Sequence, residues 1–515
     1  MKKLLYITIL LAAADTISCK KDKKNAYNGT APSKTGSTLD LIRDSVFLYA
    51  KEAYYWYDAL PSYASFNPRS FAGSTDLAAL TKEVDAISQY KINPNTGQPY
   101  EYYSGAPGEA KYSFIDEGQV STELNGSNNN FGFAPLYNDV NDLRVKYVYP
   151  GSPADLAGVK RGYKIISING NSDIAYDGGS GPHTQFVINA YSGSNTITMV
   201  LQKSDLSTIT VNLTAAAYTT NPVITYKTFN VGNGKVIGYV VFNTFTSEAN
   251  ADAKLDAAFN YFQSQGITDL VVDLRYNGGG YVATAEYLDN LIVPIAKTGA
   301  TMYSYYFNDI LASNKEVLLG NQVRREPSTN QLYNYGQFSY TVADNTTKFT
   351  KKGSLNIGRV FFIVTGSTAS ASELTINNLR PHLDVQLIGT TSYGKPVGFF
   401  DIDINKYQLY IPEFETKNSA GQGGYYTGMT PGSAEYPGVK DYDDVTKEFG
   451  DTTETLLHHA VNYVRRGIYS SPTERIQGLS GRQKTFSIDQ ANAAAIELNG
   501  NKFSGMITKK TFKNK

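Results

Sequence analysis

Cysteine and histidine are scarce in this chain of 515 residues. Cys19 is the only cysteine, so no disulfide can form within the chain and no cysteine cluster can hold a metal. No pair among the four histidines has the spacing of a zinc-binding helix motif. Neither residue type therefore indicates a metal site.

An excess of charge of either sign is also absent. Lysine and arginine number 47, as do aspartate and glutamate, so the net charge is zero. A nucleic-acid binder needs a basic surplus to neutralise phosphates, so we expect no nucleic-acid partner. Hydrophobic residues make up 41%, enough for a core, which argues against wholesale disorder. The 40 tyrosines favour a sheet-rich protein that works outside the cytoplasm.

Long hydrophobic runs are missing as well. No segment has the 18 consecutive apolar residues of a spanning helix. Residues 4–14 form a short apolar run after a basic start, which is the pattern of a secretory signal. The run ends near Cys19 and resembles a bacterial lipoprotein signal, although Thr16 departs from the usual leucine. An ordinary cleaved signal with a chance cysteine is the alternative.

We therefore expect residues 1–18 to be a lipoprotein-type signal peptide and Cys19 to carry a lipid. The protein would be exported and would contact a bacterial membrane only through that anchor. It would lie on the periplasmic or the cell-surface side.

Patterning predicts several further segments, and the fold class is an α/β core accompanied by a β-rich domain. Alternating strands and helices in one stretch are typical of βαβ units with a largely parallel, buried sheet. We expect a tether, a small helical segment with helices over 39–60 and from Ser74 or Thr75, a β-rich domain, the α/β core, and a solvated extension. Their boundaries are 19–38, 39–111, 112–215, 216–468 and 469–515. A polar excursion at about 300–355 interrupts the core, and the sequence gives it no role.

One βαβ unit contains a serine-rich turn. The expected strand 360–364 runs into residues 365–373, and a helix follows, so Ser370 lies at a strand-to-helix turn. Backbone N–H groups are exposed at a helix N-terminus, and the helix dipole favours negative charge there. This position suits a nucleophile whose reaction creates an oxyanion.

Two other loops are expected at the same edge of the sheet. Lys395 follows the next strand, 385–389, and the glycines 278–280 follow the strand that ends near Leu274. Loops after parallel strands of right-handed βαβ units share one sheet edge. A hydroxyl, an amine and a glycine-rich loop with accessible N–H groups would thus lie together.

A lysine acts as a base only when it is neutral. Burial would have to lower its pKa by roughly 3 from about 10.4, which costs about 4 kcal/mol. Without a well-placed histidine, a Ser/Lys pair fits better than a Ser-His-Asp triad. The alternatives are that Ser370 merely caps the helix, that Lys395 is solvated and that the glycines only form a turn.

These motifs resemble those of the C-terminal-processing (tail-specific) serine peptidases. The matching stretches are 273–280, 367–373 and 389–395, in that order. The resemblance implies that Ser370 is the nucleophile and Lys395 the general base. It also implies an oxyanion hole formed by the N–H groups of Ala371 and Gly279, with Gly278 or Gly280 as alternatives to Gly279. It implies no metal and no organic cofactor.

One position departs from the family pattern. The family commonly has a glutamine four residues after the lysine, where it orients the amine, and this chain has Phe399. The group that holds Lys395 is therefore not identified by the resemblance.

The β-rich region resembles the PDZ domain that the family carries. Residues 149–159 and 161–170 match its hydrophobic turn, short helix and strand hairpin. Phe131, Gly132 and Phe133 lie where the family's carboxylate-binding loop would be. Such a loop donates backbone N–H groups to a peptide carboxylate while the peptide adds to a sheet edge. A PDZ-like domain that only packs on the core is the alternative.

The resulting expectation is a serine endopeptidase that acts on protein or peptide substrates and recognises their C-termini. A catalytically weak or inactive peptide-binding lipoprotein of the same fold is the first alternative, supported by Phe399. A hydrolase of a non-peptide ester is the second, because fold alone does not determine the substrate.

Overall fold

The computed structural model describes residues 32–326, 329–470, 498, 505–509 and 513–515. The expected signal peptide and Cys19 lie outside the described residues. Among the helices described, none combines the length and hydropathy that crossing a bilayer requires.

A six-stranded sheet forms the centre of the molecule, in the order β23-β18-β17-β11-β10-β9. All its pairs are parallel except β9–β10. The strands and their helices are β9 (Val223–Gly232), β10 (Lys235–Phe242), α7 (Glu248–Ser264), β11 (Asp269–Asp273), α8 (Val282–Ile292), β17 (Arg359–Val364), α10 (Ala371–Leu379), β18 (Asp384–Gly389), β23 (Gly438–Lys440) and α11 (Thr455–Arg466). The predicted α/β core with a largely parallel sheet is confirmed.

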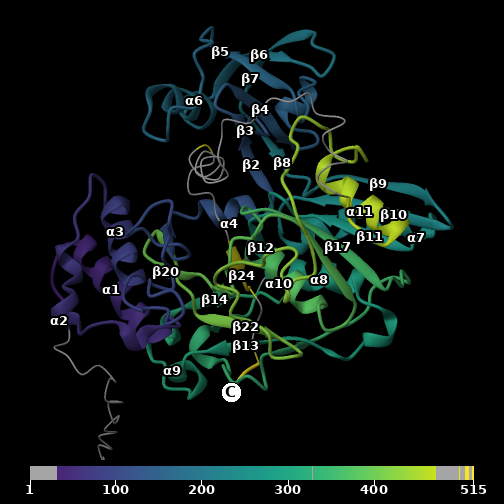
Figure 1. Cartoon of the computed structure of the whole chain (residues 1–515). Helices are drawn as coiled ribbons and strands as arrows, with labels where there is room; N and C mark the ends of the chain where they lie inside the picture. Colours follow the sequence, from purple (N-terminus) through teal and green to yellow (C-terminus); the bar gives the residue numbers. More distant parts are fainter. Residues whose placement is uncertain (1–31, 327–328, 471–497, 499–504, 510–512) are drawn as a thin grey trace, which may run out of the picture.

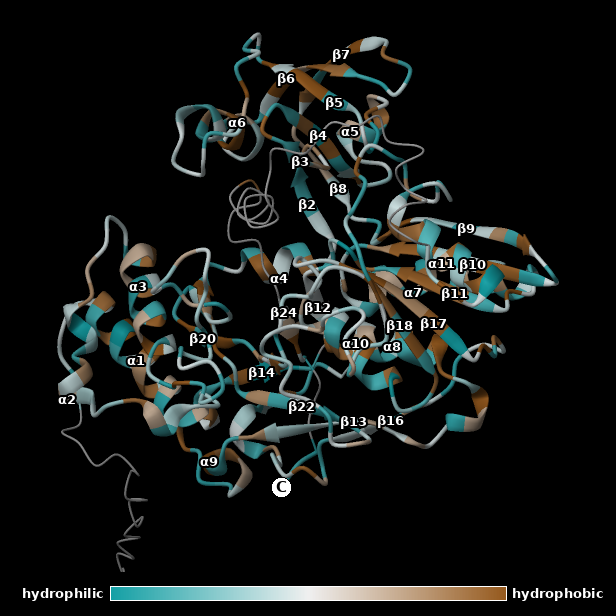
Figure 2. Cartoon of the chain, in the orientation of Figure 1, coloured by the Kyte–Doolittle hydropathy of each residue, from teal (hydrophilic) through white to brown (hydrophobic). Residues whose placement is uncertain are grey.

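Helices cover both faces of this sheet. Residues of α7, α8 and α10 join one hydrophobic cluster, whereas residues of α11 pack on the opposite face. The strand β17 is hydrophobic on both faces because it is covered on both sides, as expected for a buried parallel strand. Figure 2 shows the hydrophobic colour gathered on the strands.

The PDZ-like region forms a separate upper lobe with its own hydrophobic cluster (Figure 1). Its sheet has the order β3-β4-β5-β6-β7, and a two-stranded ribbon, β2-β8, lies below it. The elements of this region are β2 (Ser127–Asn130), β3 (Phe133–Asp139), β4 (Asp142–Val148), α5 (Pro153–Leu156), β5 (Lys164–Ile168), α6 (Pro182–Ser192), β6 (Thr196–Gln202), β7 (Thr208–Thr214) and β8 (Ala216–Thr219). The short helix α4 (Gln119–Leu124) precedes them and lies below the lobe, where Leu124 joins the hydrophobic cluster of the core.

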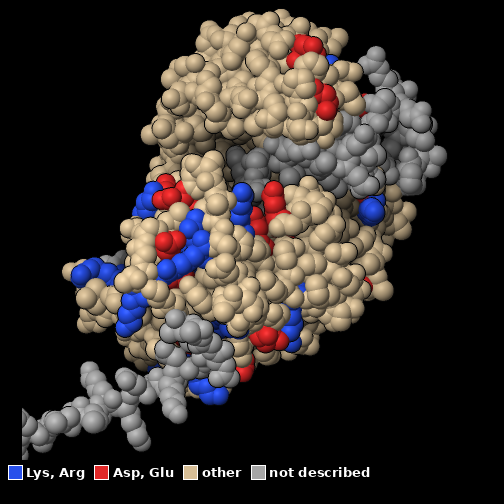
Figure 3. Space-filling model, turned by 90° about the vertical axis from the view of Figure 1, so that its left-hand side faces the viewer, with Lys and Arg blue, Asp and Glu red and all other residues tan. Residues whose placement is uncertain are grey.

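The N-terminal helices are α1 (Thr38–Ala53), α2 (Tyr63–Phe66) and α3 (Asp76–Ser88). Ser37 and Asp40 cap α1 reciprocally, and Thr75 caps α3. The predicted helix over 39–60 is too long, because the chain becomes extended at Tyr54. There the tyrosine hydroxyl donates to the buried carboxylate of Glu101, so tertiary contacts override the helical pattern. Figure 3 shows this side of the molecule, with basic and acidic groups interspersed.

The polar excursion is structured and supports the core. It contains β13 (Thr301–Phe307), α9 (Asp309–Ala312), β14 (Val323–Arg325), β15 (Leu332–Asn334) and β16 (Thr346–Lys348). β13 lies in a sheet of order β16-β13-β22-β19, with β19 (Val397–Gly398) and β22 (Phe414–Asn418). β1 (Phe114–Asp116), β20 (Ile402–Ile404) and β21 (Tyr407–Tyr410) form a further small sheet.

The expectation of a solvated extension is wrong for part of the final segment. Residues 505–507 form the strand β24, which pairs in parallel with β12 (Gly279–Tyr281). Met506 and Ile507 are fully buried. Sequence patterning could not reveal this, because a strand of three residues has too little periodicity to be recognised.

Candidate active site

Ser370 lies at the turn between β17 and α10, in a strained and buried position. Its backbone has φ +60° and ψ −109°, a conformation that side-chain-bearing residues rarely adopt. The side chain is fully buried, and its Oγ has no hydrogen-bond partner within the described part of the chain. A buried hydroxyl without a partner costs about 1–3 kcal/mol. The Ser370 N–H donates to Glu373 as in a capping box, and strain combined with an unsatisfied hydroxyl is in addition typical of a reactive position.

The carboxylate of Glu373 joins the Ser370 turn to the Lys395 loop. Its Oε2 accepts hydrogen bonds from the backbone N–H groups of Ser370 and Lys395, both at 2.8 Å. Its Oε1 accepts bonds from the Gly394 N–H at 2.7 Å and from the Ser392 hydroxyl. One buried side chain therefore fixes both loops. Sequence reasoning assigned Glu373 no role in the site, although the residue lies within the serine motif 367–373.

Lys395 is fully buried, so the alternative of a solvated lysine is wrong. Its Nζ lies 3.7 Å from the centre of the Phe399 ring and 5.6 Å from that of Tyr112. Burial holds the pKa of Lys395 well below its usual range, and the positive charge of Lys111 acts in the same direction. The carboxylates of Glu101, Glu373 and Glu413 oppose this effect. The phenylalanine that replaces the expected glutamine thus forms one wall of the amine pocket.

Residues from the N-terminal part complete this pocket, which sequence reasoning missed. Lys111 Nζ donates to the carbonyl oxygens of Gly394 and Tyr426 at 3.4 and 3.2 Å, and the Tyr112 hydroxyl donates to Gly394. Burial lowers the pKa of Lys111 to about 8. The carboxylate of Glu101 is buried and accepts the Tyr112 N–H at 3.0 Å. Because nearly 300 residues separate these groups from Lys395, no local pattern could link them.

The glycine loop lies against the first turn of α10. Gly279 has φ +101°, and a β-carbon placed on it would come within 3.0 Å of the Ala371 backbone nitrogen. Asn277 holds the loop there, since its carbonyl oxygen accepts the Ala369 N–H at 3.0 Å and the Ser372 hydroxyl at 3.0 Å. Its side-chain oxygen accepts the Gly279 N–H at 2.9 Å.

The two predicted oxyanion donors are thus neighbours beside Ser370. Ala371 belongs to the first helical turn, where N–H groups have no acceptor within the helix. The sheet order explains the convergence, because β11, β17 and β18 are adjacent and their following loops emerge at one edge.

The predicted carboxylate loop borders a groove in the upper lobe. The groove has a volume of about 540 Å³ and is lined by α4, β2 and α6 residues together with Phe131 and Leu498. The Gly132 N–H donates to the Asn130 side chain at 2.8 Å, and Phe133 begins β3. A β-carbon on Gly132 would come within 2.0 Å of Ser152, so only glycine fits this turn.

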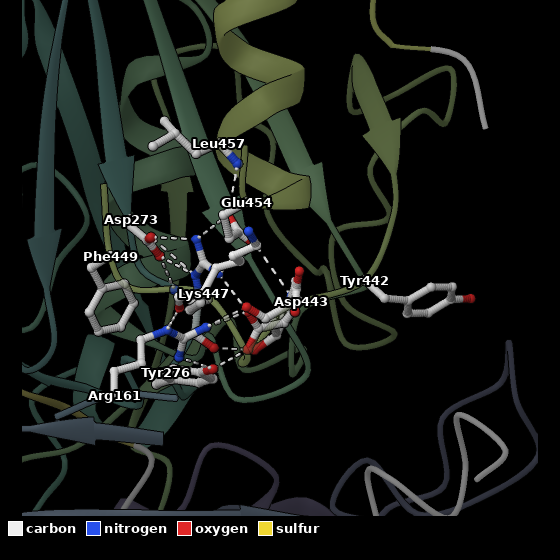
Figure 4. Close-up of polar contacts among 12 residues, drawn as sticks. Arg161, Asp273, Tyr276, Tyr442, Asp443, Lys447, Phe449, Glu454 and Leu457 are labelled. Atoms are coloured by element: carbon white, nitrogen blue, oxygen red, sulfur yellow. Dashed lines mark hydrogen bonds and ion pairs between the residues drawn. The ribbon is translucent and has the colours of Figure 1, made fainter. Parts of the chain in front are cut away.

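A buried ion cluster connects the upper lobe to the end of β11 (Figure 4). Arg161 pairs with Asp443 at 2.7 Å and donates to the Tyr276 hydroxyl at 2.8 Å. Arg275 pairs with the same aspartate at 2.6 Å and also with Asp273 and Glu454. Only two residues separate Arg275 from Gly278, so this cluster anchors the chain just before the glycine loop.

Comparison with known proteins assigns both parts of the chain. Residues 236–431 match the model of peptidase family S41, and residues 144–201 match that of the PDZ domain. The chain carries an S41 peptidase domain and a PDZ domain. The S41 match includes Ser370, Lys395 and the glycine loop, whereas Phe131, Gly132 and Phe133 precede the PDZ match.

Relatives of known name match part of the chain. A carboxyl-terminal-processing protease of a Picosynechococcus strain is 31% identical over 164 residues, covering 31% of this chain and 36% of the relative. A chloroplastic C-terminal processing peptidase of Tetradesmus obliquus is 27% identical over 232 residues, covering 43% and 47%. The chain therefore spans less than half the length of these relatives.

A solved structure shows the same fold. A Bacteroides fragilis protein named for the S41 proteases superposes with a TM-score of 0.53 at 22% identity. The match covers 84% of this chain and 98% of that one. At this identity the likeness concerns the fold alone.

Within the described residues, no group of three or more histidine, cysteine, aspartate or glutamate side chains is arranged to hold a metal ion.

Proposed function

We propose that this S41 protein is a serine-type endopeptidase that cleaves peptide bonds with Ser370 and Lys395. The Ser370 hydroxyl attacks the scissile carbonyl, and neutral Lys395 takes its proton and then delivers it to the leaving amine. One observation carries the proposal: Glu373 Oε2 binds the backbone of both residues at 2.8 Å in a fully buried site.

The site also suits stabilisation of the tetrahedral oxyanion. The N–H groups of Ala371 and Gly279 are the proposed donors, aided by the positive end of the α10 dipole. Each such donor typically contributes about 10²–10³ in kcat. The Gly279 N–H bonds to Asn277 here, so substrate would have to compete with that side chain.

The proposed substrates are proteins or peptides recognised by their C-termini. The relatives named above are called C-terminal-processing enzymes, and the groove beside Phe131 offers a place for a peptide end. We further propose that the N-terminal signal exports the protein and that a lipid on Cys19 attaches it to a bacterial membrane on the periplasmic or cell-surface side.

Replacement of the two reactive groups tests the chemistry. Ser370→Ala and Lys395→Ala should each lower kcat for a fluorogenic peptide by at least about 10³, because the two groups act as a unit. Ser367→Ala, in the same turn, and Lys235→Ala, at the surface, should keep wild-type turnover. Unchanged turnover in both site variants would rule out the pair, whereas peptide binding without any turnover would favour the inactive peptide-binding protein.

A second assay tests C-terminal recognition. Two peptides of identical sequence, one with a free carboxylate and one amidated, should differ in kcat/KM in favour of the free carboxylate. Equal kcat/KM values for the two peptides would mean that the protein cleaves peptides without recognising a free C-terminus. Cleavage of an ester analogue without cleavage of either peptide would support the non-peptide hydrolase.

A further inference from the structure

A short strand of the chain lies inside the candidate active site. β24 runs between β12 and Phe399, and it bonds to both. The Gly505 N–H donates to Gly278 at 3.0 Å, the Phe399 N–H donates to Met506 at 2.8 Å, and the Thr508 N–H donates to Phe399 at 2.8 Å. These backbone bonds are those that a peptide ligand makes when it adds to a strand.

The strand lies directly against the glycine loop, where Gly505 is paired with Gly279. A β-carbon placed on Gly279 would lie 2.2 Å from the Gly505 carbonyl oxygen and 3.0 Å from Ala371 N. The Gly505 carbonyl oxygen and the Ala371 backbone nitrogen therefore both lie close to Gly279. Met506 and Ile507 are fully buried and belong to the main hydrophobic cluster, so the strand lies inside the molecule rather than covering a surface.

The polar excursion holds the far end of the same segment. Residues 513–515 pair with residues 337–339, where Ser339 N–H donates to Lys513 at 2.7 Å and Lys515 N–H donates to Gln337 at 3.0 Å. The Lys515 ammonium also contacts the buried carboxylate of Glu316. The excursion thus gains a role that its sequence did not suggest.

A third contact places the same final part of the chain in the groove beside Phe131. Leu498 is fully buried, joins the hydrophobic cluster of the upper lobe and lines the groove beside Phe131. Only six residues separate it from Gly505. Both places where a peptide is expected to bind are therefore occupied by residues of one segment.

We propose that the space that β24 fills between β12 and Phe399, called the channel from here on, is the binding site for an extended peptide substrate, and that β24 occupies it as an internal ligand that restrains activity. The inference rests on the proposed function. The channel would take a strand parallel to β12, with apolar side chains in the two positions that Met506 and Ile507 occupy here. Substrate would have to displace β24 to reach Ser370.

A reversible disulfide that holds the end of the chain in place, called the lock below, tests this proposal in the full chain. Phe338 and Asn514 form a non-hydrogen-bonded antiparallel pair, for which Cα atoms lie about 4.5 Å apart, within disulfide range. In a Cys19→Ser background, Phe338→Cys with Asn514→Cys should turn over peptide at least about tenfold faster when reduced than when oxidised. The two single-cysteine variants should show no such difference. Equal turnover in both redox states would overturn the proposal.

Loosening the strand should have the opposite effect to locking it. Ile507→Asp introduces a charge into the channel, so β24 should leave and turnover should rise above that of the wild type. If this variant unfolds in a thermal melt, the lock alone decides.

A binding assay separates this proposal from the proposed function, because it needs no catalysis. A fluorescein-labelled synthetic peptide with the sequence of residues 505–515 is titrated into the locked chain carrying Ser370→Ala, and anisotropy is measured. The reduced form should bind the peptide at least about tenfold more tightly than the oxidised form. Equal binding, or none in either form, would overturn the channel proposal. Such redox-dependent binding in a chain that never cleaves peptides would overturn the proposed function alone.

Discussion

Lys395 is surrounded by charges that act on its pKa in opposite directions. Glu101 raises the pKa of this lysine, and Lys111 lowers it. The proposed reaction needs neutral Lys395, so kcat/KM should rise as the pH rises through its pKa. The pH at which kcat/KM rises, which is the acidic limb of the pH profile, therefore depends on the charges around Lys395.

Two neutralising substitutions should move that limb in opposite directions. Glu101→Gln removes an influence that raises the pKa of Lys395, so the limb should shift to lower pH. Lys111→Gln removes a positive charge that lowers it, so the limb should shift to higher pH. The pH profile of kcat/KM measures both, with the surface substitution Lys235→Gln as control. Shifts in the same direction, or none, would show that Lys395 does not set the limb.

The reactive residues themselves were predictable, but the groups around them were not. Ser370 and Lys395 stand in local motifs after neighbouring strands, and parallel topology brings such loops together. Glu101, Lys111 and Tyr112 reach the site through tertiary packing, which sequence spacing does not encode. The place of Phe399 was predicted, but its contact with the amine needed the three-dimensional structure.

At the scale of elements, the glycine loop must approach both α10 and β24. Gly279→Ala would place a β-carbon 2.2 Å from a backbone oxygen, in addition to its unfavourable φ. Gly266→Ala is a matched control, since Gly266 also has positive φ but has nothing within 4 Å of its β-carbon position. We expect the control to cost about 1–2 kcal/mol of unfolding free energy and Gly279→Ala to cost several kcal/mol. Urea denaturation of both proteins checks this, and equal losses would contradict the close packing.

Prediction of elements from sequence succeeded where periodicity was strong. The strands expected at 360–364 and 385–389 lie at Arg359–Val364 and Asp384–Gly389, because buried strands have a distinct pattern. The helix from residue 39 ends early because Tyr54 turns into the core. β24 was mistaken for solvated chain, since its pairing partner is more than 200 residues away.

At the scale of the whole molecule, Arg161 connects the upper lobe to the core. It is fully buried among Asp443, Tyr276 and backbone carbonyls. Arg161→Ala should destabilise the protein by about 3–5 kcal/mol, because it removes one partner of a buried pair. Arg465→Ala, at an exposed position, should change stability by less than about 0.5 kcal/mol. Calorimetry measures both, and similar values would contradict a role in coupling the lobes.

The same ion cluster should make the stability difference between the wild type and Arg161→Ala depend on pH. The guanidinium groups of Arg161 and Arg275 hold the pKa of Asp443 well below its usual range against the effect of burial. A depressed pKa stabilises the fold above the unfolded value of about 3.9, and this stabilisation is lost as the pH falls below it. The difference in unfolding free energy between the wild type and Arg161→Ala should therefore become smaller at acidic pH.

The central claim is that a neutral lysine activates Ser370. The most direct measurement is the rate at which a fluorophosphonate acylates Ser370, followed by intact mass across pH in the wild type, in Ile507→Asp and in Lys395→Ala. We predict labelling on Ser370 that rises with pH to a midpoint well below 10.5 and that falls at least about 10³-fold in Lys395→Ala. Labelling that is absent from Ser370 in both wild type and Ile507→Asp, or equally fast without Lys395, would contradict it.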